Sequence, residues 1–157
     1  MHTILTLLSC LLLLSACATN ESYRGNINYM QETKESDTHL GMRYLTGRGI
    51  PRNDEKAFSH LLTAANEGNP FAQNEVAYLY ATGKGTTQDY TKAFEYYQKA
   101  ARRNLSSAQY SLGLFYQYGL GQVPNHTKAC QLFLKSKRSG FEPAKRACLQ
   151  YCDHSTS

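Results

Sequence analysis

Apolar and small residues recur at helical spacing in a series of short segments along this chain. Stretches rich in glycine, asparagine and proline, which end helices and form turns, separate these segments. A spacing of three or four residues places the apolar side chains on one face of a helix, so each segment predicts an amphipathic helix. We expect one set of such helices at residues 37–46, 72–81 and 108–118.

The same pattern returns every 36 residues without a gap, which divides the chain into repeats at 36–71, 72–107 and 108–143. Five positions carry the same residue type in every repeat: Tyr44, Tyr80 and Tyr116; Gly47, Gly83 and Gly119; Gly49, Gly85 and Gly121; Lys56, Lys92 and Lys128; Ala57, Ala93 and Ala129. A fixed period of this length is the signature of a solenoid, in which each unit packs only against its neighbours. The repeats therefore predict a binding scaffold without identifying what it binds.

The ends of the helices are also marked. Paired glycines follow the first helix of each repeat and allow the positive φ of a helix end. Asn53, Asp89 and Asn125 lie 36 residues apart and are good N-caps for a second helix. Residues 144–157 begin a fourth first helix and then stop, so we expect a capping helix and a tail there. The sequence thus predicts an all-α solenoid of antiparallel helix pairs with a C-terminal capping helix.

The N-terminus carries a separate signal. Residues 4–16 form an apolar run that is too short to span a bilayer, which takes about 20 residues, so we interpret residues 1–16 as a signal peptide. The tetrapeptide that ends at Cys17, LSAC, resembles the bacterial lipoprotein box, and this resemblance implies lipidation of Cys17. The residues before the run contain no Lys or Arg, which departs from the pattern. An ordinary secretory signal is the alternative.

The segment after the signal is polar and weakly patterned. We interpret residues 17–35 as the lipidated cysteine and a flexible tether. Enterobacterial lipoproteins that stay in the inner membrane carry Asp where this chain has Ala18. By this resemblance we expect a palmitate-bearing outer-membrane lipoprotein of the bacterial cell envelope, with its domain facing the periplasm. Exposure at the cell surface is the alternative.

Charge narrows the set of partners. The chain holds 17 Lys and Arg against 12 Asp and Glu, which gives a net charge of +5. This mild excess argues against a nucleic-acid partner, which takes a dense basic stripe. Basic residues gather near the end of the third repeat, opposed only by Glu142: Lys135, Lys137, Arg138, Lys145 and Arg146. We interpret them as a solvated face, with lipid headgroups, lipopolysaccharide phosphates or an acidic partner as alternatives.

Three cysteines follow the predicted lipidation site, and an oxidising envelope compartment permits a disulfide between them. The second helix of repeat 3 and the capping helix form a predicted hairpin that turns near residue 141. Cys130 and Cys152 are equally far from that turn, whereas Cys148 is displaced by four residues, about 6 Å along a helix. We therefore predict a Cys130–Cys152 bond, with Cys130–Cys148 as the alternative. Three cysteines without a nearby histidine do not favour a metal site.

These repeats resemble the Sel-1-like repeat family, whose members are relatives of tetratricopeptide repeats. Two stretches carry the resemblance: Leu112-Gly113…Tyr116…Gly119-x-Gly121 and Lys92-Ala93…Tyr97-x-Lys99-Ala100-Ala101. The resemblance covers the three repeats and the cap. It implies an α-solenoid whose concave face, formed by the first helices, binds a peptide or a helix of another protein.

The resemblance also implies which side chains meet that partner. They are the residues of the first helices that point away from the core, at i, i+4 and i+7 spacing. Our candidate partner-binding residues are Met42, Asn74, Tyr78, Tyr110, Leu114, Gln117 and Arg146, on a stripe that also includes Thr38, Leu45, Ala81 and Gln150. Aromatic groups with few charges suit a protein-binding surface. The alternative is that these residues pack against one another between repeats.

The sequence offers no starting point for catalysis. It contains no S-x-x-K, H-E-x-x-H, G-x-S-x-G or phosphate-binding loop. We therefore expect a protein that is not an enzyme and that uses no cofactor, metal or small-molecule substrate. Cysteine-rich members of the resembled family carry a β-lactamase label, so a hydrolase of that kind is one alternative. A secreted factor that contacts host cells is another.

Overall fold

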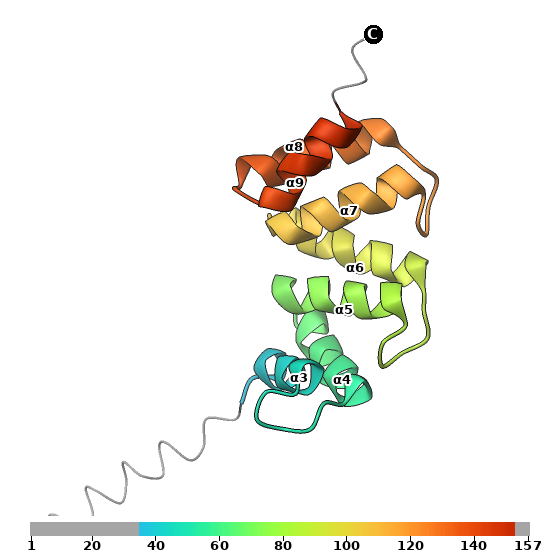
Figure 1. Cartoon of the computed structure of the whole chain (residues 1–157). Coiled ribbons are helices and arrows are strands. Elements are labelled where there is room, and N and C mark those ends of the chain that lie inside the picture. Colours follow the sequence, from blue (N-terminus) through green and yellow to red (C-terminus); the bar gives the residue numbers. More distant parts are fainter. Residues whose placement is uncertain (1–34, 153–157) are drawn as a thin grey trace, which may run out of the picture. The chain divides into compact units, whose positions relative to one another are not determined.

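The computed structural model describes residues 35–152 of the 157-residue chain. The expected signal peptide, Cys17 and nearly all of the tether lie outside the described residues. The described part contains seven α-helices and no strand (Figure 1). They are α3 (Asp37–Thr46), α4 (Asp54–Asn66), α5 (Pro70–Thr82), α6 (Tyr90–Arg102), α7 (Ser106–Tyr118), α8 (His126–Arg138) and α9 (Glu142–Tyr151).

Each helix packs against the helix that follows it in the chain. Three pairs, α3–α4, α5–α6 and α7–α8, succeed one another in Figure 1, and α9 lies on α8 as a cap. The contacts of α4 with α5 and of α6 with α7 join successive pairs. Packing between nearest neighbours is what a solenoid requires. The predicted all-α solenoid with a C-terminal cap is therefore confirmed.

The second helices begin where the sequence indicates. The side chains of Asn53, Asp89 and Asn125 accept hydrogen bonds from backbone N–H groups three residues later, at 2.8, 2.9 and 2.9 Å. Each bond satisfies one of the N–H groups that a helix leaves without an internal partner. The caps of α4, α6 and α8 thus repeat with the period of the sequence.

The first helices of repeats 2 and 3 begin two residues earlier than predicted, at Pro70 and Ser106. The side chain of Asn69 caps α5 by accepting a hydrogen bond from the backbone N–H of Ala72 at 3.0 Å. Pro70 fits the first turn because its nitrogen has no hydrogen to satisfy. The helical spacing of apolar residues behind the prediction begins at Ala72, so it does not include these two residues. The consequence is that Phe71 belongs to α5.

Glycines on the first helices let the second helices approach closely. A Cβ atom at Gly41 would lie 2.6 Å from Cγ of Leu61, and one at Gly113 would lie 2.5 Å from Cε1 of Phe133. At either distance the added Cβ atom would clash with the facing side chain. Leu61 and Phe133 are both fully buried. The pairs α3–α4 and α7–α8 are therefore built on a glycine that faces a large side chain.

An aromatic contact joins neighbouring repeats at a constant position. The rings of Phe58 and Tyr80 meet edge to face with centroids 5.1 Å apart. Phe94 and Tyr116, which lie 36 residues further along, meet in the same way at 5.2 Å. Edge-to-face pairs of this kind add about 0.5–1.5 kcal/mol beyond the burial of their area. We call this pairing the inter-repeat aromatic contact.

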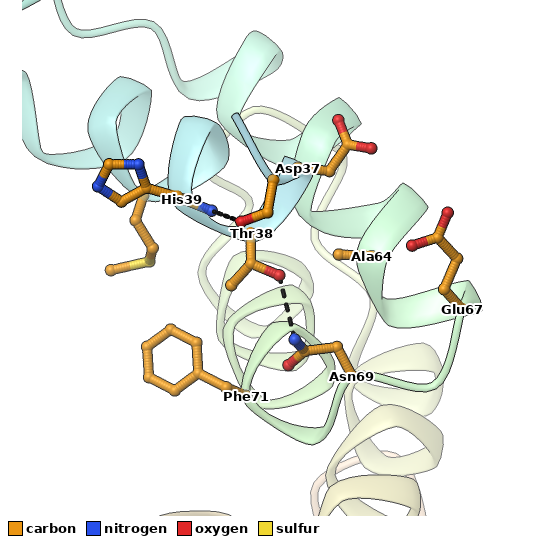
Figure 2. A pocket seen from close by; sticks show the side chains of 9 residues that line it. Asp37, Thr38, His39, Ala64, Glu67, Asn69 and Phe71 are labelled. Atoms are coloured by element: carbon orange, nitrogen blue, oxygen red, sulfur yellow. Dashed lines mark hydrogen bonds between the residues drawn. The ribbon is translucent and has the colours of Figure 1, made fainter. Parts of the chain in front are cut away.

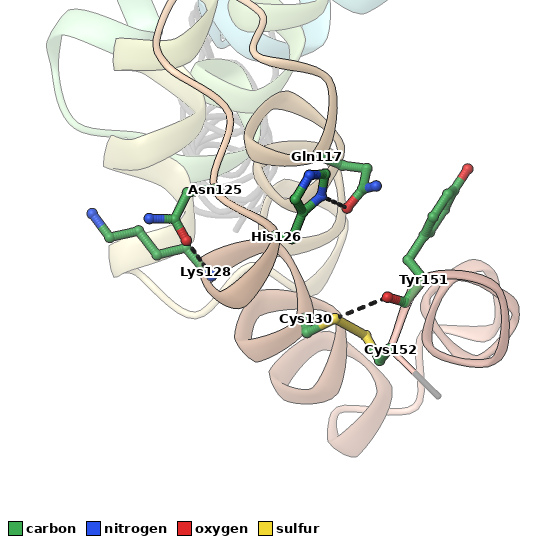
Figure 3. The surroundings of a disulfide bond; sticks show 7 residues. All are labelled: Gln117, Asn125, His126, Lys128, Cys130, Tyr151 and Cys152. Atoms are coloured by element: carbon green, nitrogen blue, oxygen red, sulfur yellow. Dashed lines mark hydrogen bonds between the residues drawn. A yellow bond between two sulfur atoms is a disulfide. The ribbon is translucent and has the colours of Figure 1, made fainter. Parts of the chain in front are cut away.

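The next step of 36 residues leads from Phe94 and Tyr116 to Cys130 and Cys152. These two cysteines form a disulfide, with Cα atoms 5.5 Å apart (Figure 3). The disulfide thus occupies the position of the inter-repeat aromatic contact and fastens α9 to α8. It is the pairing that the hairpin argument favours. Cys148, the alternative partner, is buried in the cluster between these helices.

Candidate protein-binding face

Two grooves open between the first helices of this solenoid. The first, which we call the N-terminal groove, has a volume of about 460 Å³ and lies between α3 and the start of α5 (Figure 2). Met42 and Phe71 give it an apolar lining, and Phe71 is 42% exposed. A hydrogen bond crosses this groove, since Nδ2 of Asn69 donates to Oγ1 of Thr38 at 3.2 Å. The groove therefore joins repeat 1 to repeat 2.

The ionisable side chains that line the N-terminal groove are two carboxylates and the imidazole of His39. Asp37 and Glu67 supply two carboxylates, and no Lys or Arg is among the lining residues. Oδ1 of Asp37 lies 2.8 Å from Nδ1 of His60, whereas Glu67 is exposed at the end of α4. The rim of this groove thus favours a positively charged group on a partner.

The second groove, which we call the C-terminal groove, has a volume of about 300 Å³ and lies between α7 and α9. Tyr110 and Leu114 line it from α7, and Pro143, Arg146 and Tyr151 line it from α9. This groove brings together three of the residues predicted to bind a partner. It also places the capping helix in the candidate site.

The wall of the C-terminal groove packs against the buried ring of Phe133 and the half-buried ring of Phe141. The ring centroid of Tyr110 lies 5.9 Å from that of Phe133 and 5.5 Å from that of Phe141. The ring of Tyr151 stacks on Phe133 at 5.9 Å. Tyr110 and Leu114 are half-buried, so they pack between helices and line the groove at once. Partner binding and packing between repeats, the two interpretations of these residues from the sequence, are therefore compatible.

Arg146 gives the C-terminal groove a positive charge. Its side chain is exposed, and none of the carboxylates within residues 35–152 forms an ion pair with it. The neighbouring Lys145 differs, because its Nζ atom lies 3.2 Å from Oε1 of Glu142 and it does not line the groove. Arg146 is thus available to a negatively charged group on a partner.

The two grooves are the same feature seen two repeats apart. Thr38 and Tyr110, Met42 and Leu114, and Phe71 and Pro143 are each separated by 72 residues, which is twice the period. Equivalent positions of a solenoid lie on the same side of it. Both grooves therefore open on one surface, formed by α3, α5, α7 and α9, which we call the groove face.

The middle of the groove face is formed by α5. Tyr78 is 38% exposed, and Nζ of Lys84 donates a hydrogen bond to its hydroxyl at 2.9 Å. Nδ2 of Asn74 donates to Oε1 of Glu75 at 3.0 Å. Burial raises the pKa of Glu75 above its usual range. Burial is also the main cause that raises the pKa of Tyr97, on the neighbouring helix α6, to about 12.

The structure places the seven predicted partner-binding residues at four locations. Met42 lies in the N-terminal groove, and Tyr110, Leu114 and Arg146 lie in the C-terminal groove. Asn74 and Tyr78 lie on α5 between them. Gln117 is outside both grooves, where its Oε1 atom lies 3.0 Å from Nδ1 of His126 (Figure 3).

Sequence reasoning missed Phe71, Pro143 and Tyr151. Phe71 and Pro143 lie in the first turns of α5 and α9, at positions that the apolar pattern assigned to the ends of the preceding repeats. Asn69, a good N-cap directly before Pro70, is the signal that could have placed Phe71 on the helix. The remaining lining residue, Tyr151, ends α9 next to the disulfide.

The described residues hold neither a metal-binding cluster nor a membrane-spanning helix. Residues 35–152 contain no group of three or more His, Cys, Asp or Glu side chains arranged to hold a metal ion. None of the helices in that part combines the length and the apolar character that crossing a bilayer requires.

The fold and the groove face define a helical-repeat solenoid. The Sel1 repeat model matches residues 35–69, 70–105 and 106–141. These matches cover more than half of the chain, so the protein belongs to the Sel1 repeat family. Proteins of this family are typically protein-interaction scaffolds, and the repeat is generally non-catalytic.

Solved structures of the same family are similar to this chain. A Sel1 repeat protein from Oxalobacter formigenes has 35% identity and a TM-score of 0.67, over 73% of this chain and 86% of that one. A protective antigen present in uropathogenic Escherichia coli strains has 28% identity and a TM-score of 0.67, over 69% of this chain but only 23% of its own. Cysteine rich protein B of Helicobacter pylori has 27% identity and a TM-score of 0.62, over 79% and 92%. No curated protein matches the chain.

Proposed function

We propose that this protein is a non-catalytic adaptor that binds a peptide or a helix of another protein on its groove face. The observation that carries the proposal is the pair of equivalent grooves, which open on one surface two repeats apart. Exposed aromatic side chains lie in and between them, with Phe71 at 42% and Tyr78 at 38% exposure. Clefts with rigid aromatic anchors are what proteins use to hold a partner segment.

Variants of these two exposed side chains test the proposal. We expect Phe71→Ala with Tyr78→Ala to reduce the amount of a partner captured from cells after crosslinking, because truncation removes apolar anchors without opening the core. The control is Tyr90→Ala with Leu134→Ala, whose side chains are equally exposed at 38% and 40% but line neither groove. Circular dichroism of both variants checks that helix content is unchanged. Equal capture by the two variants would place binding on another surface.

We also propose that the protein is an outer-membrane lipoprotein whose repeats face the periplasm. The support is the apolar run at residues 4–16, followed by the lipoprotein-box tetrapeptide that ends at Cys17. An acyl anchor at this position would hold the solenoid beside the membrane through the polar segment at residues 18–35.

Mass spectrometry of the protein purified from bacterial membranes tests the anchor. We expect the N-terminal peptide to begin at Cys17 and to carry acyl chains, and we expect Cys17→Ser to abolish that modification. The control is Cys10→Ser, which changes a second cysteine within the predicted signal peptide. An unmodified N-terminus at another residue would show an ordinary secretory signal instead.

A further inference from the structure

The groove face has opposite charges at its two ends. Asp37 and Glu67 line the N-terminal groove, while Arg146 is the charged residue that lines the C-terminal groove. The half-buried carboxyl of Glu75 lies on α5, whereas the carboxylate of Glu142, at the start of α9, already pairs with Lys145. The face is therefore acidic where the solenoid begins and basic at its cap.

The surroundings of the C-terminal groove strengthen this polarity. Lys135, Lys137 and Arg138 are exposed in the last turn of α8, directly before the turn into α9. Glu142 is the acidic residue of that region, and it already pairs with Lys145 at 3.2 Å. A negative group bound beside Arg146 thus meets an excess of positive charge.

We infer that the groove face binds an extended partner segment that is itself dipolar. This inference rests on the proposed function and specifies its partner. The segment places one apolar side chain in each groove, basic residues beside Asp37 and Glu67, and an acidic residue beside Arg146. Complementary charge of this kind fixes the direction in which a segment lies and excludes segments with the opposite polarity.

The geometry also sets the spacing of the two apolar anchors. The grooves are two repeats apart, and successive first helices lie no closer than packed helices, which are about 8–10 Å apart, so the grooves are separated by at least about 16 Å. An extended chain rises about 3.3 Å per residue, so the anchors are expected at least about five residues apart. An apolar side chain in each groove supplies affinity, and the flanking charges supply orientation.

Selection from a displayed library of random 12-residue peptides on the immobilised full-length protein tests this inference. We expect enrichment of peptides with two large apolar residues at least about five positions apart, with Lys or Arg at one end and Asp or Glu at the other. Arg146→Glu should remove the preference for the acidic end and weaken the best wild-type peptide about fivefold, the effect of one well-placed exposed ion pair. Lys145→Glu is the matched control, because it makes the same change in charge one residue away and outside the groove.

The possible results distinguish failure of this inference from failure of the proposed function. Peptides that are enriched without charge polarity would overturn the inference and leave binding at the groove face standing. The inference also falls if Arg146→Glu and Lys145→Glu change the selected sequences equally, since attraction would then depend only on net charge. If no peptide is enriched over the empty support, both the inference and binding of segments by this face are contradicted.

Discussion

Replacing Cys130 and Cys152 with serine is expected to lower the free energy of unfolding by about 3 kcal/mol under oxidising conditions. The bond joins residues 22 apart and occupies the position of the inter-repeat aromatic contact. Its loss removes the covalent link between α8 and α9, and α9 forms one wall of the C-terminal groove. Denaturation with urea, with and without a reductant, measures the difference. The wild type should lose the same stability on reduction, and the serine variant should not respond.

A variant that rebuilds the aromatic pair separates the role of this position from the chemistry of the bond. Cys130→Phe with Cys152→Tyr copies the pairs Phe58–Tyr80 and Phe94–Tyr116 found between the earlier repeats. We expect it to recover part of the lost stability and to be insensitive to reductant. A rebuilt pair no more stable than the serine variant would show that the cap position is not equivalent to the earlier contacts.

Phe133→Ala is expected to cost about 3–5 kcal/mol of unfolding free energy, the usual range for a buried aromatic ring. Phe133 is fully buried, faces Gly113, and supports the rings of Tyr110 and Tyr151. The cavity left by alanine therefore weakens the α7–α8 pair and removes the support of the C-terminal groove. Urea denaturation followed by circular dichroism measures the loss.

The chain supplies two controls for this substitution. Phe133→Leu copies repeat 1, where Leu61 faces Gly41, and should cost only about 1 kcal/mol. Leu134→Ala changes the next residue, which is 40% exposed, and should stay within about 0.5 kcal/mol of the wild type. Equal losses for Phe133→Ala and Leu134→Ala would contradict the packing that we describe for α7 and α8.

The architecture could be predicted from the sequence because its signals are local and repeated. Asn53, Asp89 and Asn125 cap helices with hydrogen bonds to residues only three positions later. The residue type at these positions therefore indicates where a helix begins. A period of 36 residues then fixes how the helix pairs follow one another. The same register, extended to Cys152, could also have shown that the disulfide takes the place of an aromatic contact.

The candidate site was harder to predict, since it depends on how neighbouring repeats meet. Tyr110 and Leu114 follow the helical spacing of an exposed stripe, yet they are half-buried because they pack against the cluster of buried residues formed by α8 and α9. Gln117 continues the same spacing, but its side chain forms a hydrogen bond with His126 at the start of the next helix. Phe71 was missed because a polar cap, not an apolar pattern, begins its helix. Contacts of this kind arise from tertiary packing.

Site-specific photocrosslinking in living cells tests most directly whether the groove face binds a partner. A photoreactive amino acid replaces Phe71 or Tyr78 on this face, or Tyr90 or Leu134 as equally exposed controls that line neither groove. We predict a crosslinked protein of one mass with the first pair and none with the second. The same product at Tyr90 and Leu134, with none at Phe71 and Tyr78, would contradict the proposed binding face.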